Sequence, residues 1–91
     1  MSVELKIPAL LRSHVGGVKQ LEVPEGSLRE LLEAVAAEHP AFGTQIFEEE
    51  GALHRFVNVY VNDEDARYLD GLETQVVDGD VVAILPAVAG G

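Results

Sequence analysis

The clearest periodic signal in this chain is an amphipathic helix that begins after Ser27. Apolar side chains recur there at spacings of three and four residues, at Leu28, Leu31, Leu32, Val35 and Ala36. Ser27 and Glu30 have the spacing of a capping box, in which each side chain satisfies a backbone N–H group at the helix start. The pair His39-Pro40 predicts the end of the helix. Because such a helix must bury its apolar face, the other segments are expected to form a sheet against it.

Alternating apolar and polar residues predict a hairpin before this helix. Residues 3–7 alternate with period two up to Pro8, as expected for a half-buried strand. Residues 18–23 alternate in the same way, and Pro24 ends the run. The segment Ser13 to Gly17 between the two strands is expected to be a loop. Residues 3–23 are therefore predicted to form an antiparallel hairpin.

Two longer strands are predicted after the helix. Phe56 to Val61 alternates between two faces, and Val81 to Leu85 is apolar on both faces, as central strands often are. The side chains expected to meet the helix are those of Val57, Val59 and Val61 from the first strand and of Val82 and Ile84 from the second. The opposite face would then carry Phe56, Tyr60 and Leu85, and we predict that these three residues form a docking surface for a partner.

The remaining segments are read as short connections. Ala41 to Phe47 is expected to add a brief helical turn at the edge of the core, and Asp65 to Tyr68 a short edge strand. Asn62-Asp63 and Asp78-Gly79-Asp80 have the composition of turns. The order is strand, strand, helix, strand, strand, which predicts an α+β sandwich of two layers.

The composition favours some classes of partner and argues against others. The chain has 91 residues, the length of one domain, and a formal net charge of −10 from 16 acidic and 6 basic side chains. This charge argues against nucleic acids and anionic membranes as partners; it favours a basic docking face, although acidity also serves solubility. The absence of cysteine excludes disulfides and cysteine nucleophiles. With no run near the ~20 apolar residues of a membrane span and no signal-peptide pattern, we expect a cytoplasmic location.

No group of side chains has the pattern of a catalytic or metal site. The acidic runs Glu48-Glu49-Glu50 and Asp63-Glu64-Asp65 lack the convergent spacing of metal ligands. His14, His39 and His54 are far apart in the sequence, and we interpret them as surface or helix-capping residues. The sequence therefore predicts that this chain is not an enzyme and binds no metal or cofactor of its own.

The last six residues, Pro86 to Gly91, have only small side chains and end in two glycines. Residues 1–85 are expected to be the folded domain and residues 86–91 a flexible arm, which would reach on the order of 20 Å when extended. A terminal carboxylate, with a pKa near 3.5 in model peptides, is a poor electrophile, but an ATP-using partner could activate it as an acyl-adenylate. Glycines would let the arm enter a narrow active site. The alternative is an ordinary frayed terminus.

This plan, with Asp78-Gly79-Asp80, the apolar strand, Pro86 and Gly90-Gly91, resembles the ubiquitin-like β-grasp sulfur carriers (ThiS/MoaD-like) of thiamin, molybdopterin and cysteine biosynthesis. The segments Leu53 to Asp65 and Leu85 to Gly91 are similar to the actinobacterial cysteine-biosynthesis branch of that family. So are Ile7-Pro8, Leu11-Arg12 and Gly16-Gly17. The resemblance implies a mixed sheet packed on one main helix, followed by a flexible diglycine tail.

The resemblance also implies a function for the arm. Gly91 would be adenylated and converted to a thiocarboxylate by an activating enzyme (an E1-like adenylyltransferase and sulfurtransferase). The sulfur would attack an aminoacrylate held by a pyridoxal-phosphate-dependent cysteine synthase that uses O-phosphoserine, and a zinc metalloprotease would then release cysteine. ATP, pyridoxal phosphate (PLP) and zinc belong to these partner enzymes. The arm that the partners grip would consist of Ala87, Val88, Ala89 and Gly90.

Three other functions remain open at this point. A carrier of the same kind could serve molybdopterin or thiamin synthesis instead of cysteine synthesis. A protein modifier would use the same adenylate to form isopeptide bonds with lysines. A plain β-grasp interaction domain would not need Gly90 and Gly91 at all.

Overall fold

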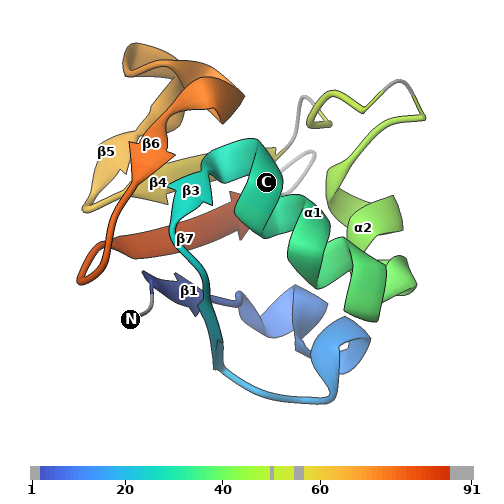
Figure 1. Ribbon diagram of the computed structural model, residues 1–91. Helices are drawn as coiled ribbons and strands as arrows, with labels where there is room; N and C mark the ends of the chain where they lie inside the picture. The colour runs from blue at the N-terminus through green and yellow to red at the C-terminus, as the bar shows by residue number, and fades with distance from the viewer. Residues whose placement is uncertain (1–2, 50, 55–56, 87–91) are drawn as a thin grey trace.

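A mixed sheet and one main helix form the two layers of the structure (Figure 1). The computed structural model describes residues 3–49, 51–54 and 57–86. The strands are β1 (Val3–Lys6), β2 (Gln20–Val23), β3 (Gly26–Ser27), β4 (Val57–Val61), β5 (Glu64–Asp65), β6 (Gln75–Val76) and β7 (Val81–Pro86). The helices are α1 (Leu28–Glu38) and α2 (Pro40–Ile46), with short 3-10 helices at Ala9–Val15, Ala66–Tyr68 and Gly71–Glu73. The predicted two-layer α+β architecture is confirmed.

The strand order of the main sheet is β2-β1-β7-β4-β5. β1 and β2 form the predicted antiparallel hairpin, with Leu5 opposite Leu21. β7 lies at the centre of the sheet, parallel to β1 and antiparallel to β4. The sheet is therefore mixed, as the resemblance implied, and the last strand before the chain terminus is held by a neighbour on each side.

Helix α1 begins at the predicted capping box. The Ser27 hydroxyl accepts the Glu30 N–H group at 3.1 Å, and the Glu30 carboxylate accepts the Ser27 N–H group at 2.9 Å. These two bonds satisfy backbone donors that the first turn of a helix leaves without intrahelical partners. The apolar stripe is fully buried at Leu28, Leu31 and Leu32. The sequence therefore predicted both the start and the inward face of this helix.

The core lies between α1 and the sheet, and it contains the apolar residues that alternation assigned to that side. Val82 and Ile84 of β7 are buried, as are Val59 and Val61 of β4, whereas Val57 is half-buried. The buried apolar side chains are Val3, Leu5, Ile7, Leu11, Val15, Val23, Leu28, Leu31, Leu32, Val35, Phe42, Ile46, Val59, Val61, Ala66, Val76, Val82 and Ile84. The helical turn predicted after α1 is α2, and its Phe42 and Ile46 are fully buried.

The prediction of a loop from Ser13 to Gly17 is wrong over most of its length. A 3-10 helix covers Ala9–Val15, and the chain turns only at Gly16, whose φ of 78° lies in the left-handed region. Leu11 and Val15 are four residues apart and both are buried. Burying these two side chains beside α2 favours a helical connection over an exposed loop.

The prediction of an edge strand from Asp65 to Tyr68 is also wrong beyond its first residue. Strand β5 is Glu64–Asp65, which pairs with the end of β4, and Ala66–Tyr68 forms a 3-10 turn. The Asp65 carboxylate accepts the Arg67 N–H group at 2.9 Å and so caps that turn. A side-chain oxygen that takes a nearby backbone donor competes with the strand ladder, and here it ends the strand.

Two further strands were not predicted. β3 and β6 pair antiparallel next to the start of α1, with Ser27 opposite Gln75. Each is two residues long, too short for alternation to be visible in the sequence. None of the helices in the described part of the chain is both long and apolar enough to cross a membrane.

Candidate functional site

The structure gives the final strand two faces of different character. Along β7, Val82 and Ile84 are buried against the helix layer, whereas Ala83 is half-buried and Leu85 is 49% exposed on the other face. This is the alternation that the sequence predicted. β7 is the last described strand before the predicted arm, so its outward residues would be the described residues nearest to a protein that held the arm.

A network of hydrogen bonds fixes the start of β7. The Asp80 carboxylate accepts the Val77 N–H group at 2.9 Å and the Asn62 side-chain amide at 3.0 Å. In return, the Asn62 side-chain oxygen accepts the Val81 N–H group at 3.0 Å. The Val77 N–H and then the Asn62 amide hold the pKa of Asp80 below its ordinary value, because both stabilise the charged form. The turn predicted at Asp78-Gly79-Asp80 is thus locked to the turn after β4.

Two of the three residues predicted for the docking surface lie on the open face of the sheet. Tyr60 of β4 is half-buried and lies opposite Ala83 of β7 in the antiparallel register. Leu85 lies opposite Asn58 in the same register, so Tyr60 and Leu85 are diagonal neighbours across the two central strands. Phe56 lies outside the described residues. We call the surface formed by Tyr60, Ala83 and Leu85, with Asn58 beside them, the open docking face; its role in docking stays a prediction.

Sequence reasoning missed one charged neighbour of this face. Lys6 is exposed and lies opposite Ala83 in the parallel register of β1 and β7. It supplies a positive charge at the border of the open docking face, in a chain with few basic residues. Alternation in residues 3–7 placed Lys6 on the outer face, but no local signal shows that β1 pairs with β7, because parallel pairing joins segments that are far apart in the sequence.

The first residue of the predicted arm, Pro86, is the last residue of the described sheet. β7 continues to Pro86, whose Cα lies opposite that of Val57 in β4. The residues predicted to enter partner enzymes, Ala87, Val88, Ala89, Gly90 and Gly91, lie outside the described residues. The division at residue 86 and the roles of these five residues therefore stay predictions.

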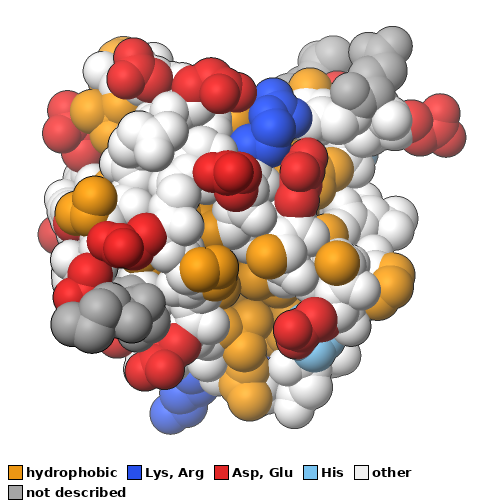
Figure 2. Space-filling model, in the orientation of Figure 1, with side chains coloured by type: hydrophobic (Ala, Val, Ile, Leu, Met, Phe, Trp, Pro, Cys, Tyr) orange, Lys and Arg blue, Asp and Glu red, His pale blue; other side chains and the backbone are white. Residues whose placement is uncertain are grey.

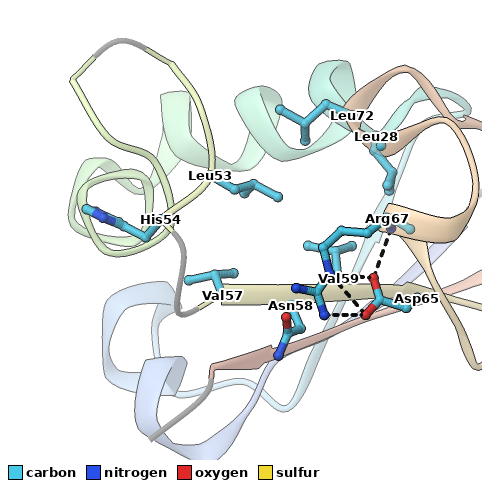
Figure 3. A pocket seen from close by; sticks show the side chains of 11 residues that line it. Leu28, Leu53, His54, Val57, Asn58, Val59, Asp65, Arg67 and Leu72 are labelled. Atoms are coloured by element: carbon cyan, nitrogen blue, oxygen red, sulfur yellow. Dashed lines mark hydrogen bonds and ion pairs between the residues drawn. The ribbon is translucent and has the colours of Figure 1, made fainter. Parts of the chain in front are cut away.

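A depression lies on the helix side of β4, opposite the open docking face and under the first turn of α1 (Figure 3). It has a volume of about 240 Å³, and the apolar side chains of Leu28, Leu53 and Leu72 point into it. An ion pair stands at its border: the Arg67 guanidinium donates to the Asp65 carboxylate at 2.8 Å, and the side-chain hydrogen bond lowers the pKa of Asp65. Because Arg67 and Asp65 neutralise each other, this ion pair leaves no unpaired charge at the depression. The wall of the depression is mainly apolar.

The histidines and acidic runs make no reactive centre in the described structure. His14 lies in the first 3-10 helix, His39 at the end of α1, and His54 before β4, where its Nε2 atom is 3.3 Å from the Thr44 carbonyl oxygen. Among the described residues, no group of three or more histidine, aspartate or glutamate side chains could hold a metal ion. The reactive group predicted from the sequence, the carboxyl group of Gly91, lies outside the described residues.

Comparison with known families and proteins covers the whole length of the chain. Residues 5–91 match the ThiS family. The chain is 44% identical to the sulfur carrier protein CysO of Mycobacterium tuberculosis over 93 residues, which covers 100% of each protein. Both matches extend over the two terminal glycines.

Solved structures agree with the sequence comparison. A chain in the crystal structure of the BexX/CysO complex of Amycolatopsis orientalis is 48% identical, with a TM-score of 0.89 over 98% of this chain and 99% of that one. The solution structure of small archaeal modifier protein 1 from Methanosarcina acetivorans is 32% identical, with a TM-score of 0.86 over 99% of this chain and 96% of that one. The chain is thus similar both to a sulfur carrier and to a protein modifier.

Proposed function

The chain belongs to the ThiS family, and we propose that it is a sulfur carrier protein that serves cysteine biosynthesis through a thiocarboxylate on Gly91. The observation that carries this proposal is the similarity to CysO of M. tuberculosis, which runs through the entire length of both proteins at 44% identity. The family match reaches Gly91 itself. A cytoplasmic location is part of the same proposal.

The chemistry of the terminal carboxyl group requires a partner. An ionised carboxylate resists nucleophilic attack, and the pKa of an α-carboxyl group near 3.5 keeps it ionised at neutral pH. An E1-like activating enzyme would transfer AMP from ATP to the Gly91 carboxylate and release pyrophosphate. Sulfide would then displace AMP and leave a thiocarboxylate. This step is an acyl substitution, so no oxidant or reductant is needed.

The acceptor in the proposed pathway is a PLP-dependent O-phosphoserine sulfhydrylase. The thiocarboxylate sulfur would form a bond to the β-carbon of the aminoacrylate that this enzyme makes by eliminating phosphate from O-phosphoserine. A zinc metalloprotease would then hydrolyse the link between Gly91 and the new cysteine, which restores the carboxylate. PLP and zinc are supplied by these partners, and the carrier supplies one reactive sulfur atom in a fixed position.

The described structure supports a role for the folded body in presenting the arm. β7 is held at the centre of the sheet by β1 and β4, and its turn is fixed by Asn62 and Asp80. The open docking face places Tyr60 and Leu85 next to the end of this strand, where a partner holding Ala87 to Gly91 would contact them. We propose that Phe56 contributes to the same face. Holding the body in one orientation would convert sulfur transfer into an effectively intramolecular step.

A second candidate function is protein modification. The similarity to small archaeal modifier protein 1 of M. acetivorans favours it, since that protein has the same fold at 32% identity. A modifier would use the same Gly91 adenylate, but its product would be an isopeptide bond to a lysine. The two functions differ in product mass. A sulfur carrier gains one sulfur atom in place of oxygen, whereas a modifier gives conjugates of much higher mass on a denaturing gel.

The direct test is the intact mass of the protein after incubation with the activating enzyme of its own host, ATP and sulfide. A thiocarboxylate-selective alkylating reagent must be included, because oxidation of Met1 adds nearly the same mass as exchange of oxygen for sulfur. We expect an alkylated species whose modification maps to Gly91. In a parallel sample that is not alkylated, addition of the host's O-phosphoserine sulfhydrylase and O-phosphoserine should consume the thiocarboxylate and add cysteine to the chain.

A chain that lacks Gly91 is the matched control, since it keeps every described residue of the body. It should give no alkylated species. If the full-length chain also remains a plain carboxylate with all components present, the carrier proposal is wrong. If alkylation succeeds but a molybdopterin or thiamin acceptor takes the sulfur and the cysteine synthase does not, the proposed pathway is wrong and the carrier function stands.

A further inference from the structure

We propose that the outer edge of β2 and the adjoining groove against α1 bind an extended, basic segment of a partner protein by strand addition. This edge strand groove is lined by Leu21, Glu22, Val23, Pro24, Ala34, Val35, Glu38 and His39. It lies on the side of the sheet away from β4 and β5, so it is separate from the open docking face. The inference does not depend on the proposed sulfur chemistry.

The backbone of β2 presents unpaired groups at this edge. β2 pairs with β1 on one side, and within the described residues no strand pairs with its other side. The Ile7 N–H group donates to the Lys19 carbonyl at 2.8 Å. This bond shows which residues of β2 direct their backbone groups at β1, because hydrogen-bonded and non-hydrogen-bonded pairs alternate along two antiparallel strands. Leu21 and Val23 therefore direct their N–H and C=O groups at β1, while those of Gln20 and Glu22 point outward. An added strand could satisfy all four outward groups.

The side chains next to this edge favour an apolar residue in the added strand. Leu21 and Val23 lie on the helix side of β2, and Ala34 and Val35 of α1 face them across the groove, which has a volume of about 90 Å³. Figure 2 shows the groove as a strip of apolar surface beside the helix, with acidic side chains on both sides. Because side chains alternate along a strand, every second residue of an added segment would face this strip.

The charge around the groove selects the partner. Glu22 and Glu38 line it, and no lysine or arginine among the described residues does. The Asp78 N–H group donates to the Glu25 carboxylate at 2.7 Å and holds it just beyond the end of β2. A segment that alternates small aliphatic residues with lysine or arginine complements both features. A second copy of this chain fits poorly, since edge-to-edge pairing would bring the glutamates of two β2 strands together. The opposite edge, β5, offers two residues before its 3-10 turn.

The test uses the full-length chain labelled with ¹⁵N and a capped peptide of about seven residues, the length of an ordinary strand, in which valine alternates with lysine. We expect saturable NMR shifts centred on residues 20–24 and 34–39. We also expect slower amide exchange at Gln20 and Glu22, because an added strand protects outward N–H groups. A peptide in which glutamate replaces lysine should bind at least roughly tenfold more weakly.

Matched variants locate the site. Ala34 and Ala37 are both exposed on α1, but only Ala34 lines the groove. Ala34→Arg should fill the apolar strip and weaken binding of the lysine peptide by roughly tenfold or more. Ala37→Arg should bind the peptide as tightly as the native chain does. Circular dichroism establishes that both variants fold.

Three results would overturn the proposal. One is the absence of peptide-induced shifts at residues 20–24 at millimolar peptide. Another is equal peptide binding by Ala34→Arg and Ala37→Arg. The third is sedimentation of the native chain as a dimer that Ala34→Arg dissociates, which would assign the edge to a second copy of this chain.

Discussion

The two faces of β7 alternate residue by residue, yet they have different roles. Val82 and Ile84 on the inner face are almost completely buried, whereas Leu85 on the outer face is half exposed to solvent. Burial of the inner residues stabilises the fold, since each fully buried aliphatic side chain contributes about 1.5–3 kcal/mol. The outer residues contribute little to stability and are available to a partner. One strand thus separates the residues that hold the domain together from the residues that we propose for partner recognition.

Removal of Gly91 should have the largest effect of any change on function and the smallest on stability. We expect a complete loss of thiocarboxylation, because the new terminal carboxyl group on Gly90 would stop one residue, roughly 3.5 Å, short of the site of adenylation. The melting temperature should hardly move, since the last residues of a domain generally add little to the free energy of unfolding. Intact mass spectrometry and differential scanning calorimetry measure the two quantities. A large drop in melting temperature would show that the arm is part of the folded body.

A truncation on the inner face should have the largest effect on stability. Ile84→Ala leaves a cavity in a fully buried site, and we expect the free energy of unfolding to fall by about 2–5 kcal/mol. The matched variant on the outer face, Leu85→Ala, should cost about 0.5 kcal/mol or less. Urea denaturation followed by circular dichroism provides both values. Equal losses of unfolding free energy in the two variants would show that the two faces contribute equally to stability.

A charge on the outer face should affect recognition without unfolding the protein. Leu85→Asp places a carboxylate in the open docking face beside Asn58, and we expect the KM for the activating enzyme to rise by roughly tenfold. The melting temperature should stay within a few degrees of the native value, because Leu85 is already half exposed. Steady-state loading assays test this. An unchanged KM would move the docking surface to another part of the molecule.

Acid should weaken the fold through the groups that hold β7 in place. The pKa of Asp80 is lowered in the folded state, first by the Val77 N–H group and then by the Asn62 amide, from an ordinary value of 3.8. A depressed folded pKa contributes stability above the unfolded pKa, and that contribution disappears as the pH falls through the folded value. Between about pH 7 and pH 2, the melting temperature should therefore fall less in Asp80→Asn than in the native chain.

Glu48→Gln is the control for this pH series, because Glu48 is exposed in the segment after α2. It should keep the pH dependence of the native chain. If Asp80→Asn and the native chain lose stability in parallel, the hydrogen bonds to Asp80 do not contribute to the acid sensitivity. The effect is the smallest of the set, since these groups lie at an exposed turn.

The sequence predicted the elements whose signals are local. The capping box at Ser27, the stripe through Leu31 and Leu32, and the alternation in β4 and β7 all depend on residues close together in the chain, and the structure confirms each of them. The same alternation placed Tyr60 and Leu85 on one face before any pairing was known. The resemblance to the sulfur carriers, confirmed by the family match, supplied the role expected of Gly91.

Features that depend on distant segments were missed. The parallel pairing of β1 with β7 brings Lys6 to the open docking face, and the packing of α1 beside β2 creates the edge strand groove at Leu21 and Ala34. Neither contact produces a periodic pattern in the sequence. The 3-10 helix at Ala9–Val15 had a partial signal in the spacing of Leu11 and Val15, but the following glycines favoured a loop. In each case tertiary burial decided the outcome, and local propensity did not.

The most direct test of the account is one loading experiment on three chains: the native protein, Ile84→Val and Leu85→Asp. Each would be incubated with the activating enzyme, ATP and sulfide at a temperature where all three are folded, and alkylated intact masses would be followed over time. We predict that the native chain and Ile84→Val acquire sulfur at Gly91 at similar rates and that Leu85→Asp does so about tenfold more slowly at low enzyme concentration. A native chain that never acquires sulfur at Gly91 would contradict the central claim.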